Sequence, residues 1–230
     1  MAEIILGLGV GQCGLKLLSE MLCAQPDTLV TYEDRPFLPW QQPADPSCMA
    51  TRLERWRKTR SHARIGDVAS FYLPYMEELL EIEPHCRILC LHRPKPEVLQ
   101  AIQLSLEKTL RPTDNWRKTL PSGWYRDPQR MIIYPQYNVP TRLAALERYY
   151  EEYAARTHLL SQRFPERFRL FDPQEWETEE GVRKVLTFAG IPLAEQKIFT
   201  VRKVPLTEIP LSEEKLLQRW NETAKGGNFS

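Results

Sequence analysis

A glycine-rich loop near the start of the chain is the segment best suited to bind a ligand. Residues 9–14 read Gly-Val-Gly-Gln-Cys-Gly and follow the apolar run Ile4–Leu6. Glycines let backbone amides approach a phosphate closely, and a helix that begins directly after the loop adds partial positive charge. We expect such a helix over Leu15–Cys23, where leucines recur at helical spacing. The loop therefore predicts an anion site.

One interpretation of the loop is a dinucleotide site. Its glycines satisfy G-x-G-x-x-G, and a β-branched, apolar strand is expected over Thr28–Tyr32. Glu33 and Asp34 follow that strand, about twenty residues after the loop. An acidic residue in this place bonds the ribose of NAD in a Rossmann unit. An NAD(P)- or FAD-binding Rossmann protein is therefore one alternative.

The loop also has the glycine spacing of a Walker A motif, from Gly9 to Gly14. The next residues are Leu15 and Lys16, where that motif requires Lys and then Ser or Thr. Without the hydroxyl, the usual magnesium ligand is missing. This departure disfavours a magnesium-dependent NTPase or kinase.

A third interpretation comes from resemblance to the sulfotransferases, especially their bacterial members. Residues 9–18, Gly-Val-Gly-Gln-Cys-Gly-Leu-Lys-Leu-Leu, resemble the family's 5′-phosphosulfate loop, G-x-x-[RK]-[SC]-G-T-[TS]-x-[LF]. Residues 87–99 are similar to the strand, loop and helix that hold the donor's 3′-phosphate. Later, a long helix, a strand and a helix ending in Phe188-Ala-Gly-Ile-Pro192 follow the family's order. The resemblance covers about residues 3–193.

This resemblance implies a donor and the residues that hold it. Sulfotransferases use PAPS (phosphoadenosine phosphosulfate) and need no metal. Arg93 would bind the 3′-phosphate, since arginine makes bidentate, charge-assisted bonds to phosphate oxygens. Ala101 stands eight residues later, where the family has a serine. The loop residues implied in donor binding are Gly9, Gly11, Gln12, Cys13, Gly14, Leu15 and Lys16.

The same resemblance points to Glu33 as the general base. In tyrosylprotein-type sulfotransferases a glutamate follows the loop's catalytic arginine by twenty-one residues, the spacing of Gln12 and Glu33 here. A carboxylate in a closed cleft can have its pKa raised enough to accept a proton. A solvent-facing glutamate at a strand end is the other interpretation. Gln12 carries no charge, so Lys16 is an alternative source of the loop's cation, or else a solvated helix lysine.

Three departures from the family pattern leave the function open. Gln12 replaces a basic residue, Leu15 replaces a phosphate-binding threonine, and Ala101 replaces the serine. The leading hypothesis is a PAPS-dependent sulfotransferase that acts on a hydroxyl acceptor. The main alternative is a sulfotransferase-fold binding or assembly module without catalysis.

The elements that must position these residues alternate between buried strands and amphipathic helices. The first β–loop–α–β unit predicts a parallel sheet. Further helices are expected over 70–83, 97–108, 141–162 and 179–189, and strands over 87–91 and 167–171. The resemblance implies a P-loop NTPase-like, three-layer α/β fold with a central parallel sheet flanked by helices. Residues 1–230 would form one domain, with 193–230 as a C-terminal extension that includes a helix near 213–224.

Two segments have no clear place in this scheme. Residues 111–140 hold five prolines and two tryptophans with little periodicity, and their aromatic content favours an ordered loop. Six basic residues against one acidic residue lie between Thr51 and Arg64, which fits a solvated helix face or a lip for an anionic ligand. Aromatic residues that either stack on an acceptor or pack internally are Trp40, Trp116, Trp124 and Tyr134.

Composition narrows the class of protein. A net charge of +1 over 230 residues gives no global attraction to nucleic acid or acidic membranes. Four scattered histidines predict no metal site. Without a signal peptide or a run of ~18 apolar residues, we expect a cytoplasmic protein with no transmembrane segment and a small-molecule, saccharide or peptide acceptor. The five cysteines are expected to be free thiols, with Cys23, Cys86 and Cys90 buried.

Overall fold

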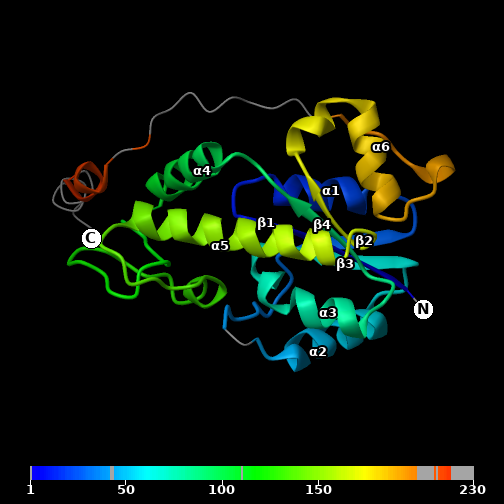
Figure 1. The fold of residues 1–230 in the computed structure, drawn as a ribbon, viewed down its shortest axis with the longest axis horizontal. Helices are drawn as coiled ribbons and strands as arrows, with labels where there is room; N and C mark the ends of the chain where they lie inside the picture. Colours follow the sequence, from blue (N-terminus) through cyan, green and yellow to red (C-terminus); the bar gives the residue numbers. More distant parts are fainter. Residues whose placement is uncertain (1, 42–43, 110, 201–209, 211, 219–230) are drawn as a thin grey trace, which may run out of the picture.

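A five-stranded parallel sheet in the order β2-β3-β1-β4-β5 forms the centre of the molecule (Figure 1). The computed structural model describes residues 2–41, 44–109, 111–200, 210 and 212–218. The strands are β1 Glu3–Gly9, β2 Thr28–Tyr32, β3 Arg64–Val68, β4 Arg87–Leu91 and β5 Phe168–Phe171. Parallel strands all end at one edge, so the segments that follow β1, β2 and β4 meet there.

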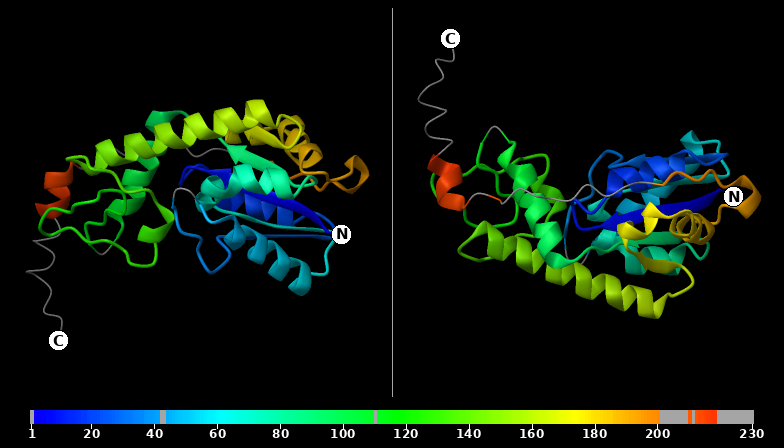
Figure 2. Two further views of the ribbon diagram at one scale, coloured as in Figure 1. Left: turned by 60° about the horizontal axis from the view of Figure 1, so that its bottom comes forward. Right: turned by 90° about the horizontal axis from the view of Figure 1, so that it is seen from above.

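Helices cover both faces of this sheet and complete the three-layer α/β architecture, as expected (Figures 1 and 2). On one face lie α1 (Leu15–Cys23) and α6 (Glu179–Phe188). The other face is covered by α2 (Pro46–Thr59), α3 (Met76–Ile82), α4 (Lys95–Glu107) and α5 (Arg142–Arg163). Four short 3-10 helices join these elements: η1 Ser70–Tyr75, η2 Met131–Ile133, η3 Pro173–Glu177 and η4 Leu193–Glu195.

Side chains of β1 supply both halves of the core. Ile4, Leu6 and Leu8 pack toward α2 to α5, whereas Ile5 packs toward α1 and α6. A strand buried on both faces is apolar without alternation, which is why β1 is readily seen in the sequence. The boundaries predicted for α1, β2 and β4 are confirmed. Pro74 divides the helix expected over 70–83 into η1 and α3, because proline lacks the N–H that a continuous helix needs.

β3 is a strand that the sequence patterns did not predict. It lies between β1 and β2, and all five of its residues are buried, including Arg64 and Asp67. Gly66 fits because a Cβ atom at this position would lie 1.7 Å from the carbonyl oxygen of Ile5. A strand with two charged residues and a glycine has neither apolar periodicity nor strand propensity, so its pairing depends on partners distant in the sequence.

Residues 111–140 form a lobe beyond the carboxyl edge of the sheet, at the far end of α4 and α5 (Figure 2). Their backbone is ordered by bridges such as Thr113 to Tyr125. Part of the C-terminal extension packs there: residues 213–218 are helical, Leu216 is buried, and Glu213 lies 3.4 Å from Arg117. Residues 219–224 of the predicted helix lie outside the described residues. None of the described helices is long and apolar enough to cross a membrane.

Candidate functional site

The glycine loop joins β1 to α1 at the carboxyl edge of the sheet. Gln12 and Gly14 have left-handed backbone, with φ of 66° and 101°, which curls the loop toward the start of the helix. A Cβ atom at Gly11 would meet no atom within 4 Å, so the loop is open on that side. No side chain among the described residues caps the N-terminus of α1. Free helix amides beside an open glycine turn suit an anion.

Two side chains at the end of the loop face the core, whereas that of Gln12 is exposed. Cys13 and Leu15 are buried, so only their backbone amides are available to a ligand. Burial raises the pKa of the Cys13 thiol to about 12 and keeps it neutral. The Gly9 N–H donates to the phenol oxygen of Tyr153 over 3.0 Å, and that hydroxyl donates to the Ser70 carbonyl over 3.1 Å. Tyr153, on α5, thus fixes the start of the loop, a role that its place in a helical stripe did not reveal.

Arg93 connects the segment after β4 to the glycine loop. Its guanidinium donates to the Gln12 carbonyl over 3.1 Å and pairs with Glu97 of α4 at 2.7 Å. The side chain is 14% exposed, so it does not project into solvent as a surface arginine would. The predicted loop and the predicted Arg93 segment therefore meet directly.

A serine lies within reach of the loop, although not where the family pattern has one. The Gln12 side-chain amide donates to the Ser105 hydroxyl over 3.2 Å. Ala101 lies one turn earlier on the same helix, α4, and offers no polar atom. A helix repeats its face every three to four residues, so position 105 replaces position 101 on this face. That offset is the signal by which Ser105 could have been found.

Lys16 lies on the outer surface of α1. Its side chain is 75% exposed, and its ammonium nitrogen is 3.8 Å from the Glu20 carboxylate one turn on. An exposed pair of this kind contributes little to stability and leaves the lysine free to move. Lys16 as the source of the loop's cation stays a prediction.

Glu33 follows β2 in a constrained position. Its backbone has φ of 51°, and its side chain is 13% exposed. The carboxylate accepts a hydrogen bond from the Tyr32 hydroxyl over 3.2 Å and lies 3.4 Å from the Arg130 guanidinium. Arg130 belongs to the lobe formed by 111–140, so this lobe reaches the sheet at Glu33. No periodicity or motif in the sequence marks Arg130.

The sheet sets the distance between Glu33 and the loop. Tyr32, the last residue of β2, and Gly7 both pair with Val68 of β3, so β1 continues for two residues beyond the level at which β2 ends. Neighbouring strands lie about 4.8 Å apart, so the axes of β1 and β2, with β3 between them, are roughly 10 Å apart.

Aromatic rings line the region between the loop and the far lobe. Their ring centroids are 4.6 to 6.5 Å apart in a connected cluster made of Trp40, Trp116, Tyr134, Tyr149 and Tyr153. Trp116 is buried and Trp40 half-buried, and both pack on these neighbours. Trp124 lies apart, with the Arg117 and Arg142 guanidinium groups over its ring. Internal packing is thus observed for all four residues weighed as acceptor contacts.

Several arginines of the basic cluster on α2 are used inside the molecule, whereas Lys58 faces solvent with a 70% exposed side chain. Arg52 is buried and donates to the carbonyls of Asp34 and Pro36. Arg60 donates to the Gly66 carbonyl over 2.6 Å. Arg57 pairs with Glu83 at 2.6 Å. Neither a solvated face nor a lip for an anion is observed for Arg52, Arg57 and Arg60, because their guanidinium groups are internal donors to backbone and carboxylate oxygens.

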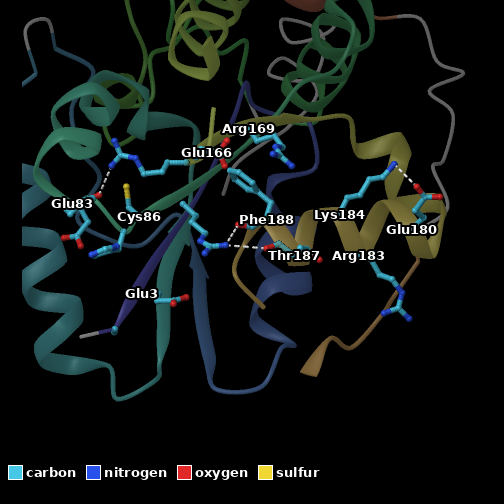
Figure 3. Close-up of a pocket in the computed structure, with 15 residues that line it drawn as sticks. Glu3, Glu83, Cys86, Glu166, Arg169, Glu180, Arg183, Lys184, Thr187 and Phe188 are labelled. Carbon is cyan, nitrogen blue, oxygen red and sulfur yellow. Dashed lines mark hydrogen bonds and ion pairs between the residues drawn. The ribbon is translucent and has the colours of Figure 1, made fainter. Parts of the chain in front are cut away.

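A cavity of about 990 Å³ lies at the opposite, amino edge of the sheet and is lined by charged side chains (Figure 3). Two of its arginines bind helix ends. Arg87 donates to the Phe188 carbonyl over 2.9 Å at the end of α6, and Arg167 donates to the Leu80 carbonyl over 2.7 Å near the end of α3. Cations at helix C-termini satisfy free carbonyls and oppose the helix dipole. These arginines therefore have structural roles.

No family model and no curated protein matches the sequence. Twelve chains of solved structures do match. One is the crystal structure of a sulfotransferase from Alicyclobacillus acidocaldarius, with a TM-score of 0.53, 15% identity, and coverage of 98% of this chain and 91% of that chain. The chain has a sulfotransferase-like fold. At this identity the likeness concerns the fold alone.

The strand order of this sulfotransferase-like fold also argues against a Rossmann protein. In a Rossmann unit the second strand adjoins the first, so that its terminal acidic residue reaches the ribose of the bound nucleotide. Here β3 separates β1 from β2, and Glu33 lies one strand farther away. No group of three or more His, Cys, Asp or Glu side chains suited to a metal occurs in the described part of the chain.

Proposed function

We propose that this protein transfers a sulfuryl group from PAPS to a hydroxyl acceptor. The observation that carries the proposal is the contact of Arg93 with the Gln12 carbonyl, which joins the two segments implied in donor binding. PAPS has anionic groups at both ends of its nucleotide. An open glycine turn beside a cationic side chain and the Ser105 hydroxyl supports binding of such a molecule.

In this proposal the loop amides and the Gln12 amide hold the donor's 5′-phosphosulfate, while Arg93 and Ser105 bind the 3′-phosphate. The phosphate would displace Glu97 from the Arg93 guanidinium. Glu33 removes the proton from the acceptor hydroxyl as its oxygen attacks the sulfur. The bond between sulfur and the 5′-phosphate oxygen breaks, and adenosine 3′,5′-bisphosphate leaves. Such transfers have loose transition states, so positioning and charge stabilisation supply most of the catalysis.

A second candidate is a binding module with the same donor site and no transfer. The binding module is supported by the lack of a cationic side chain in the loop itself, because Gln12 is neutral and Lys16 lies beside Glu20 on the surface of α1. The fold and the backbone amides of the loop are common to both candidates. They differ in turnover and not in donor binding.

The nucleotide specificity of the loop is tested by thermal denaturation with adenosine 3′,5′-bisphosphate, NAD, and ATP with magnesium. A ligand that binds only the folded state raises the melting temperature. We expect adenosine 3′,5′-bisphosphate to stabilise the protein without magnesium. Stabilisation by NAD and not by the bisphosphate would reject both candidates.

Calorimetry then locates the 3′-phosphate. Arg93→Ala should weaken binding of adenosine 3′,5′-bisphosphate by about 1.5–3 kcal/mol, the size of a hydrogen bond to a charged group. Arg169→Ala is the matched control, because Arg169 is exposed near the amino edge and lies over the Phe188 ring. An unchanged dissociation constant for Arg93→Ala would remove this residue from the site.

A further inference from the structure

The backbone at Glu33 requires support from its surroundings. A φ of 51° lies in the left-handed region, which is unfavourable for a residue with a Cβ atom unless the fold determines it. The Glu33 N–H donates to the Val68 carbonyl over 3.0 Å, which extends the pairing of β2 with β3 by one residue. The next amide, that of Asp34, leaves the sheet and donates to the Asp67 carboxylate over 3.0 Å. The turn is thus held on both sides of Glu33.

Asp67 is the inner anchor of this turn. It is fully buried on β3 and accepts from three donors: the Asp34 N–H, the Thr31 hydroxyl at 2.7 Å and the Tyr72 hydroxyl at 2.6 Å. Burial raises the pKa of Asp67, and the hydrogen bonds oppose this shift. A buried carboxylate with several donors has a fixed orientation, because each lost bond leaves an unsatisfied polar group.

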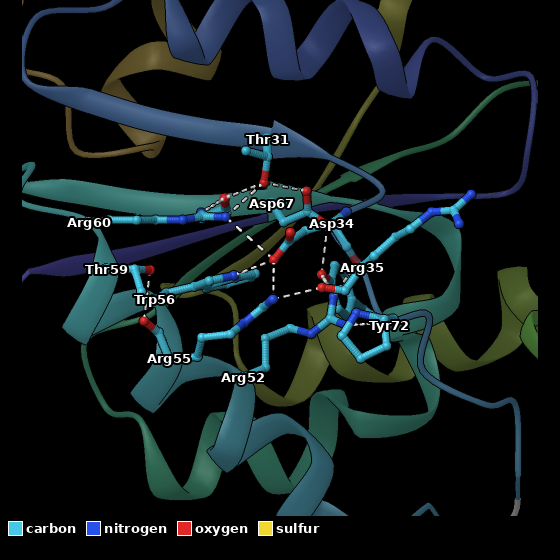
Figure 4. Close-up of polar contacts among 12 residues, drawn as sticks. Thr31, Asp34, Arg35, Arg52, Arg55, Trp56, Thr59, Arg60, Asp67 and Tyr72 are labelled. Atoms are coloured by element: carbon cyan, nitrogen blue, oxygen red, sulfur yellow. Dashed lines mark hydrogen bonds and ion pairs between the residues drawn. The ribbon is translucent and has the colours of Figure 1, made fainter.

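Side chains of α2 contact the same turn from its outer side, and we refer to them together with Asp67 as the clamp (Figure 4). The Asp34 carboxylate accepts from the Trp56 indole over 2.6 Å and from Arg55, and Arg60 lies 3.4 Å away. Arg52 donates to the Asp34 carbonyl over 2.8 Å and to the Tyr72 hydroxyl over 2.7 Å. The basic cluster of α2 therefore surrounds the residue after Glu33 from several directions.

We propose that Asp67 is a positioning residue for Glu33. Through the Asp34 amide it holds the left-handed turn that directs the Glu33 carboxylate toward Arg130 and the carboxyl edge of the sheet. Asp67 touches neither donor nor acceptor and acts only through the backbone. The proposal rests on the proposed role of Glu33 as general base. In this arrangement β3 carries Asp67 to the turn, and the α2 arginines bind the Asp34 carbonyl and carboxylate.

Asp67→Asn tests this role, because it keeps the shape of the side chain and removes its charge and one acceptor atom. Misplacing a catalytic group by about 1 Å can cost roughly 100-fold in rate. We expect turnover to fall roughly 10- to 100-fold, with the dissociation constant for adenosine 3′,5′-bisphosphate unchanged. In a Glu33→Gln background, Asp67→Asn should cost less than about threefold, since residues that act through one group are non-additive. Equal losses in both backgrounds would overturn the proposal.

Hydrogen exchange measures the turn independently of turnover. The Asp34 amide should exchange at least about tenfold faster in Asp67→Asn, because the neutral side chain leaves one acceptor oxygen for three donors, while amides inside β1 stay protected. Unchanged exchange at Asp34 would also overturn the proposal. If the native protein transfers no sulfuryl group, the proposed function fails, whereas the exchange result still decides whether Asp67 holds the turn.

Two further variants guard against a general effect on folding. Tyr72→Phe removes one donor to Asp67. It should change turnover and Asp34 exchange in the same direction as Asp67→Asn but by a smaller factor, and it serves as the test if Asp67→Asn does not fold.

Arg57→Gln breaks the ion pair of α2 with Glu83 and touches neither Asp34 nor Asp67. It should leave turnover and Asp34 exchange as in the native protein, and a loss equal to that of Asp67→Asn would assign the effect to α2 docking.

Discussion

Glu33 and its neighbours illustrate how much of this site depends on single side chains. The carboxylate is nearly buried, accepts from Tyr32 and lies beside the Arg130 guanidinium. These contacts hold it in one orientation without covering it fully. A general base needs such an orientation before its basicity matters.

Replacing Glu33 tests the proposed reaction at the residue scale. Glu33→Gln keeps the shape and most of the hydrogen bonds but removes the basicity. We expect turnover to fall roughly 10²- to 10⁴-fold, the range for general-base catalysis, with donor affinity nearly unchanged. The assay follows transfer of labelled sulfate from PAPS to a panel of sugar, phenol and peptide acceptors.

Glu180→Gln is the control for this experiment, since Glu180 is an 80% exposed residue of α6 paired with Lys184. Its turnover should match that of the native protein. Full activity of Glu33→Gln would exclude Glu33 as the base. Binding of adenosine 3′,5′-bisphosphate without transfer to any acceptor would favour the binding module.

At the scale of elements, β3 determines the geometry of the site. It separates β1 from β2 and thereby sets the distance between the loop and Glu33. It also carries Asp67 to the clamp. Its insertion depends on close contact with β1 at Gly66, where the backbone of Ile5 leaves no room for a side chain.

Gly66→Ala should therefore destabilise the whole sheet. The new Cβ atom would lie 1.7 Å from the Ile5 carbonyl oxygen, so the strands must separate. We expect a loss of about 3 kcal/mol or more in the free energy of unfolding, at or above the usual cost of overpacking, measured by urea denaturation. Gly11→Ala is the matched control, because its Cβ atom meets nothing within 4 Å and should change stability by less than about 0.5 kcal/mol. Equal stability of the two variants would contradict the close approach of β1 and β3.

At the scale of the whole molecule, the five cysteines differ in their burial. Cys13, Cys86 and Cys90 are buried and Cys48 is half-buried. Cys23 is exposed, contrary to its expected burial, because it lies at the end of α1 on the face away from the core. Burial raises the pKa of the Cys13 and Cys86 thiols to about 12, and it also raises the pKa of the Cys90 thiol well above its usual value.

Alkylation of the native protein should follow this division. The thiolate is the reactive form, so buried thiols with raised pKa react slowly even when reagent reaches them. With iodoacetamide at pH 8, we expect Cys23 to react first and Cys48 more slowly. The three buried thiols should react only as the molecule unfolds, as read by peptide mass spectrometry. Cys23→Ser should remove the fast phase, and rapid labelling of Cys90 in the folded protein would contradict this packing.

Local patterns in the sequence were sufficient for the elements with regular apolar spacing. The loop and α1 are marked by glycines followed by a leucine stripe, and β2 and β4 are short apolar runs. These signals need no knowledge of distant residues, because strand and helix periodicity depends only on which face is buried. The order of motifs along the chain resembled that of the sulfotransferases, and the parallel three-layer fold followed from it.

Only the tertiary structure determined where the charged residues act. Arg52, Arg60 and Asp67 resemble solvent-exposed residues in the sequence, yet each is buried among partners from other elements. Arg130 and Ser105 reach Glu33 and Gln12 across 97 and 93 positions of the chain. A buried charge is stable only when it is paired or hydrogen-bonded. The sequence shows that a residue is charged, but it does not show which distant residue will be its partner. The glycine loop was therefore recognisable from the sequence alone, whereas the contacts that surround Glu33 and Asp34 were not.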